Sequence, residues 1–161
     1  MPNWTYLVVS ALYHAGLAIW IGGIVVLGAL TAPALFRRLD RAVAGEIFGG
    51  ILHRFAVLRL AAIVMAIAAA AAKYLAWETH AISAGHATWI AIRWIALALM
   101  AAVAGYELAV LEPATERRRV LIRADGEAGD PARLEFNRLH RRAEAIMKAS
   151  LLAAMVALLF S

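Results

Sequence analysis

The sequence predicts an all-α integral membrane protein, built as an up-down bundle of four transmembrane helices. The 161 residues are 64% hydrophobic and only 17% charged, and the mean hydropathy of +0.75 lies outside the range of ordinary soluble domains. Four apolar segments are each close to the ~20 residues that a helix needs to cross a bilayer: 6–30, 55–77, 88–111 and 144–160. Nearly all of the chain is span or connector, which predicts a single membrane domain over residues 1–161.

The basic residues indicate how the chain is oriented in the membrane. The connectors after the first and third segments are rich in arginine, whereas residues 78–87 contain no Lys or Arg. By the positive-inside rule, the two basic connectors lie in the cytoplasm and both termini lie outside, in a bacterial inner (cytoplasmic) membrane. Attraction of these arginines to anionic headgroups accounts for the net charge of +5, so membrane lipids rather than nucleic acid are the expected partners. The absence of cysteine excludes disulfides and thiolate metal sites.

The first apolar run, residues 6–38, carries features that a purely lipid-facing helix does not need. These are His14, Trp20, paired glycines at 22 and 23, and Pro33. An ionisable side chain is costly in lipid, and it usually faces the protein interior at a functional site. His14 is therefore the first candidate functional residue, and Pro33 is expected to limit how far this helix runs undisturbed.

The second and fourth helices are predicted to begin well ahead of their spans. Asp40 is a candidate N-cap for a helix starting at Arg41, and apolar positions then recur at helical spacing as far as Phe55. Asp130 followed by Pro131 gives a similar start to the last helix. Both extensions lie on the predicted cytoplasmic side, where they project from the membrane or lie along its surface.

Three charged residues fall at one depth on the cytoplasmic side of three different spans. At ~1.5 Å per residue, Arg59, Glu107 and Lys148 each lie roughly 6–7 Å inside their segments. We expect them to form an ion network with Glu107 as the acceptor. The alternatives are a packing lock with the two cations snorkelling to the interface, and a proton or ion relay through Glu107.

The outer side holds basic residues with no acid at matching depth. By the same helical rise, Lys73, Arg93 and His14 lie roughly 6, 7 and 12 Å inside their segments, with Glu78 at the rim as the one candidate partner. Buried like charges repel. Either His14 is neutral while the other two snorkel, or an anionic group such as a lipid headgroup, a quinone head or porphyrin propionates sits among them. We expect an outer-leaflet pocket built from His14, Trp20, Lys73 and Arg93.

Histidines also suggest a cofactor. A neutral imidazole facing a bundle interior is a standard ligand of haem or metal, so His14 is a candidate axial ligand of haem b. His14 and His140 together form a candidate metal site. Neither a Ser-His-Asp set, a phosphate-binding loop nor a paired-histidine zinc helix is visible in the sequence, so no catalytic residue is assigned.

Two stretches resemble a known family. Residues 14–55, HAGLAIWIGGIVVLGALTAPALFRRLDRAVAGEIFGGILHRF, look like the start of the transmembrane-protein-205-like family of four-span proteins. Residues 136–155, FNRLHRRAEAIMKASLLAAM, are similar to that family's entry into its last helix. The layout is more distantly similar to four-span protoporphyrinogen oxidases and copper-resistance D-type proteins. The oxidase resemblance implies haem association of His14 and puts Arg93 in place of a lysine, and arginine cannot donate a lone pair to iron.

These features predict a small inner-membrane binding or accessory protein that is not an enzyme, acting alone, as a homo-oligomer or as a subunit of a membrane complex. A competing hypothesis is a b-type haem redox protein or porphyrin oxidoreductase with His14 as axial ligand. A third is a metal or proton conductor that uses His14, Glu107 and His140.

Overall fold

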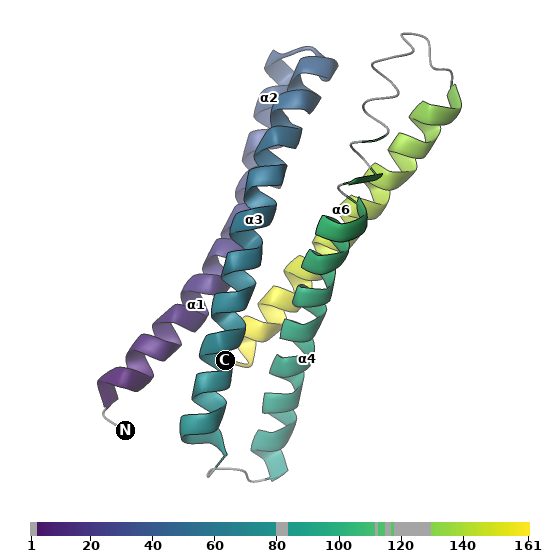
Figure 1. Ribbon diagram of the computed structural model, residues 1–161. Coiled ribbons are helices and arrows are strands. Elements are labelled where there is room, and N and C mark those ends of the chain that lie inside the picture. Colours follow the sequence, from purple (N-terminus) through teal and green to yellow (C-terminus); the bar gives the residue numbers. More distant parts are fainter. Residues whose placement is uncertain (1–2, 80–83, 112, 115–116, 118–129) are drawn as a thin grey trace.

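The computed structural model describes residues 3–79, 84–111, 113–114, 117 and 130–161 (Figure 1). Side chains are not described for residues 3, 84–85, 130–137 and 140. All of the secondary structure assigned to the described residues is helical, as the sequence predicts.

The helices join into long rods. The first rod comprises α1 (Asn3–Val25), the π-helical segment η1 (Val26–Thr31) and α2 (Ala32–Arg38); the second comprises α3 (Arg41–Lys73) and η2 (Tyr74–Glu78); the third comprises α4 (Ala84–Tyr106) and η3 (Glu107–Leu111). The last is α6 (Asp130–Leu159). Successive rods run in opposite directions (Figure 1). The end at which the first rod begins, the second ends and the third begins is called the N-terminal end below.

Three of these helices are long and apolar enough to cross a membrane: Trp4–Arg38, Arg41–Glu78 and His86–Leu111. The chain is therefore an all-helical, multi-pass membrane protein. The fourth predicted span, 144–160, falls in α6, which is not among the three, so it stays a prediction. Helices begin at Arg41, as expected, and at Asp130, one residue before the expected start at Pro131, whereas the side of the membrane on which they lie stays a prediction.

Pro33 does not end the first rod. Proline has no N–H to donate to the preceding turn, and the hydrogen-bond register widens to a π-helix immediately before it. The hydroxyl of Thr31 donates to the carbonyl of Val26 at 3.1 Å. The rod then continues to Arg38. The next helix starts after Asp40, whose carbonyl accepts from Ala44 N–H at 2.8 Å, although its side chain makes no capping bond.

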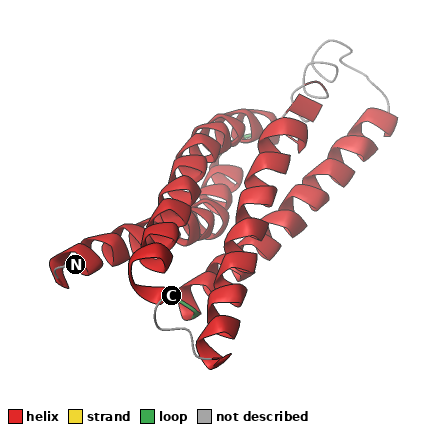
Figure 2. Cartoon of the chain, turned by 60° about the horizontal axis from the view of Figure 1, so that its bottom comes forward, coloured by secondary structure: helices red, strands yellow, loops and turns green. Residues whose placement is uncertain are grey.

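The first rod packs along α3, and α4 packs along α6, with contacts of α1 to α6 and of α3 to α4 joining the two pairs (Figure 2). Gly16 allows a close approach of the α1 and α3 backbones, since a Cβ there would lie 2.6 Å from the backbone oxygen of Ala62. Small residues at such crossings give helices in lipid their packing contacts. Between α1 and α6, the buried Tyr13 hydroxyl donates to the carbonyl of Ala157 at 2.7 Å.

Candidate functional site

A bidentate ion pair joins the second and third rods at the N-terminal end. Arg93 on α4 donates from Nη1 to Glu78 Oε1 at 2.8 Å and from Nη2 to Glu78 Oε2 at 2.5 Å. The side chain of Arg93 is 3% exposed and that of Glu78 is 20% exposed. Glu78 is the last residue of η2. The protein itself thus supplies the counter-charge of Arg93, and neither an anionic ligand nor snorkelling is needed for it.

Lys73 lies at the same end without such a partner. The residue is 4% exposed, and its ammonium nitrogen lies 5.5 Å from the ring centroid of Tyr6 and 5.7 Å from that of Tyr13. Among the residues that the structure describes, no carboxylate lies within ion-pair distance of Lys73. Cation–π contacts compensate only part of the desolvation of an ammonium group. Tyr6 and Tyr13 were not singled out in the sequence, because tyrosine is ordinary near the end of a membrane span.

A second buried ion pair lies further along the same two rods. Arg59 on α3 pairs with Glu107, the first residue of η3. The guanidinium carbon of Arg59 also lies 5.0 Å from the ring centroid of Trp20 and 5.7 Å from that of Phe55. Trp20 is fully buried. Of the four residues expected in one outer-leaflet pocket, Trp20 therefore belongs to the Arg59 cluster instead.

Lys148 lies apart from that cluster. It donates to Glu144 Oε1, one turn earlier on α6, at 2.7 Å, and its side chain is 73% exposed. Exposed i,i+4 pairs of this kind contribute only tenths of a kcal/mol, about 0.3–0.5. The expected three-residue network is thus an Arg59–Glu107 pair in the structure, with Lys148 bonded elsewhere.

His14 is exposed on the surface of α1. Its Nδ1 lies 2.6 Å from the carbonyl oxygen of Ser10, and its Nε2 lies 3.2 Å from Ser161 Oγ. The carbonyl can only accept, so Nδ1 carries a proton and donates to it. An axial ligand of haem needs a ring nitrogen directed into an enclosed space. His14 does not fit that requirement here, and Arg93, the second residue that the oxidase resemblance implicates, is paired with Glu78.

The candidate metal site receives no support from contacts. The side chain of His140 lies outside the described residues. The described part of the chain contains no group of three or more His, Cys, Asp or Glu residues that could hold a metal ion.

Comparison with known proteins identifies a family. Residues 15–123 match a family model described as "Domain of unknown function (DUF4149)". The chain belongs to the DUF4149 family. The matched DUF4149 region includes Trp20, Lys73 and both buried ion pairs, and His14 lies one residue before it. No match was found among curated proteins or among solved structures. DUF4149 membership supports a membrane protein of unknown activity, and the transmembrane-protein-205-like, oxidase and copper-resistance relationships stay predictions.

Proposed function

We propose that this DUF4149 protein is a small four-span protein of the bacterial inner membrane that binds an anionic lipid at its outer end and catalyses no reaction. The observation that carries the proposal is the burial of Lys73 beside two tyrosine rings and no carboxylate. Ionisable groups within membrane spans are rare, usually paired, and mark binding sites or pathways. An anionic headgroup would supply the pair that the described residues leave out.

The proposed orientation places this site in the outer leaflet. The arginine-rich connectors follow the first and third spans, so the positive-inside rule puts them in the cytoplasm and the N-terminal end of the molecule outside. In this topology, residues 144–160 of α6 form the fourth span. Lys73 and its tyrosines then lie at the depth where aromatic and basic side chains meet headgroups.

The other functions have less support. Haem binding by His14 requires an imidazole that faces inward, whereas His14 is exposed and bonded through both ring nitrogens. The carboxylate that a proton relay through Glu107 would use is paired with the buried Arg59 guanidinium instead.

Competition between lipids tests the proposal. The protein in detergent is offered equimolar phosphatidylglycerol and phosphatidylcholine, and retained lipid is measured by native mass spectrometry. We expect retention of phosphatidylglycerol, and loss of that preference in Lys73→Met. A charge-assisted hydrogen bond contributes about 1.5–3 kcal/mol, so the dissociation constant should rise roughly tenfold or more.

Two further variants serve as controls. Lys73→Arg keeps a cation at the position and should keep the preference. Arg54→Gln removes an exposed cation from the half of α3 that follows the first connector. This variant should also keep the preference for phosphatidylglycerol. A wild-type protein without preference, or a Lys73→Met protein that retains it, would contradict the proposal.

A further inference from the structure

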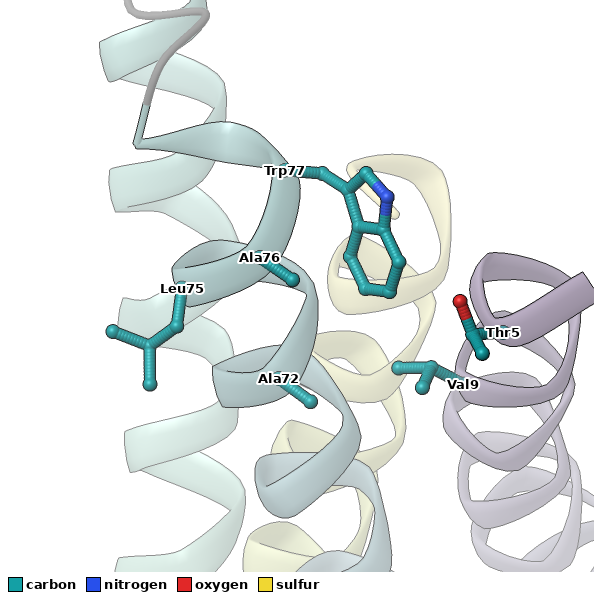
Figure 3. Close-up of a pocket in the computed structure, with 6 residues that line it drawn as sticks. All are labelled: Thr5, Val9, Ala72, Leu75, Ala76 and Trp77. Carbon is teal, nitrogen blue, oxygen red and sulfur yellow. The ribbon is translucent and has the colours of Figure 1, made fainter. Parts of the chain in front are cut away.

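An open apolar groove lies between the start of α1 and the end of the second rod. It has a volume of about 350 Å³. Figure 3 shows its walls: the ring of Trp77 extends from η2 toward α1, which carries Thr5 and Val9, while Ala72 and Ala76 project from the second rod below that ring and Leu75 points away. This volume falls at the low end of the ~300–1,000 Å³ found for small-molecule sites.

Small side chains create the groove. Ala72 and Ala76 are one turn apart on the second rod, and Thr5 and Val9 are one turn apart on the first, so each pair lines one wall. All of these residues belong to helices that are long and apolar enough to span the membrane. An open apolar space with this lining, between two helices that can each span the membrane, matches a hydrocarbon chain better than a polar solute.

The groove adjoins the buried lysine. The ring of Tyr6 meets that of Trp77 edge-on, with centroids 5.4 Å apart, and the Lys73 ammonium lies 5.5 Å from the same Tyr6 ring. Tyr6 therefore contacts both the charge and the wall of the groove. Tyrosine and tryptophan favour this boundary, where one end of a ligand is polar and the other apolar.

We propose that the groove holds one acyl chain of the anionic lipid whose headgroup pairs with Lys73. This inference rests on the proposed function and deepens it, because it adds a site for an acyl chain to the headgroup site at Lys73. Complementarity supports the choice of occupant: the groove is apolar, and the buried cation Lys73, which has no ionic partner among the described residues, contacts Tyr6 beside its Trp77 wall.

Filling the groove tests this inference. Ala76→Phe places a ring in the space, and retained diacyl phosphatidylglycerol, measured by native mass spectrometry, should fall about tenfold. The Ala76→Phe protein should still bind dihexanoyl phosphatidylglycerol, whose chains are too short to occupy the groove fully. This binding should still require Lys73. Val64→Phe is the matched control, because Val64 is exposed on the same rod and does not line the groove. Ala76→Leu replaces Ala76→Phe if the larger side chain prevents folding.

The outcomes separate the two proposals. Loss of diacyl lipid in Lys73→Met but not in the Ala76 variants overturns the groove inference and leaves the headgroup site standing. Loss in the Ala76 variants but not in Lys73→Met overturns the headgroup site and leaves a groove for the chain of a neutral lipid. Displacement of the lipid by an equimolar short-chain quinone overturns the assignment of an acyl chain as occupant.

Discussion

Glu78 accepts two hydrogen bonds from the guanidinium of Arg93, and this pair has a counterpart further along the same two rods, where Arg59 pairs with Glu107. The order of charges is reversed between the two pairs: the second rod supplies the base in one pair and the acid in the other. Both carboxylates belong to π-helical segments, where the wider turn changes the direction of side chains. Together, the pairs fix the register of α3 against α4.

Breaking the Arg93–Glu78 pair should destabilise the protein. Glu78→Gln leaves the Arg93 guanidinium buried without a counter-charge, and removal of one partner from a buried pair costs about 3–5 kcal/mol. We expect a clear fall in the melting temperature in detergent. The exchanged double variant, Glu78→Arg with Arg93→Glu, should recover part of the loss. Equal melting temperatures of wild type and Glu78→Gln would show that the pair contributes no stability.

Replacing both partners of the Arg59–Glu107 pair should lower the stability of the protein less than replacing one of them. Glu107→Gln leaves Arg59 with only the Trp20 and Phe55 rings, which predicts destabilisation. The double variant Arg59→Met with Glu107→Met buries no charge, and such replacements are often neutral or stabilising by about 1–4 kcal/mol. Melting temperatures of the three proteins in one detergent check this ranking. A double variant less stable than Glu107→Gln would contradict it.

The glycines of α1 should differ sharply in their tolerance of a methyl group. A Cβ at Gly16 would lie 2.6 Å from the backbone oxygen of Ala62, which cannot move without shifting α3. Overpacking of this kind costs about 1–3 kcal/mol, so Gly16→Ala should lower the melting temperature. Nothing lies within 4 Å of a Cβ at Gly22, so Gly22→Ala should be neutral or slightly stabilising. Equal effects at both positions would show that α1 does not approach α3 so closely.

Replacing His14 should change neither the visible absorption spectrum nor the stability of the protein. Its side chain is exposed, and exposed substitutions usually change stability by no more than about 0.5 kcal/mol. We expect His14→Ala to leave both the melting temperature and the visible absorption spectrum of the purified protein unchanged. A Soret band in the wild type that disappears in the variant would establish haem ligation and overturn this prediction.

Hydrophobicity predicted the existence of the first three spans, because lipid requires long uninterrupted helices whatever their partners. It did not predict which way each side chain points. Tyr13 and His14 are adjacent, yet Tyr13 is buried and His14 is exposed, since neighbouring helix positions point about 100° apart. Depth along a helix likewise does not predict contacts. Lys148 and Glu107 were expected at the same depth and in one network, but Lys148 bonds to Glu144 on its own helix.

The sequence also did not predict how side chains at the helix ends are oriented. The sequence places Glu78 at the rim of its span. In the structure Glu78 pairs with Arg93 from a π-helical segment, which no residue pattern predicts. The expectation of three uncompensated basic groups was therefore too broad. Lys73 alone of the three is both buried and without an ionic partner among the described residues.

Lys73→Met should stabilise the lipid-free protein while it weakens binding of anionic lipid. An ammonium buried against two tyrosine rings loses most of its hydration, and methionine fills a similar volume without that penalty, so we expect a higher melting temperature in neutral detergent. A ligand that binds only the folded state raises stability further. Phosphatidylglycerol should therefore raise the melting temperature of the wild type more than that of Lys73→Met. Lower stability of the variant in neutral detergent would instead assign Lys73 a packing role with Tyr6 and Tyr13, since the aromatic contacts would then outweigh the desolvation of the charge.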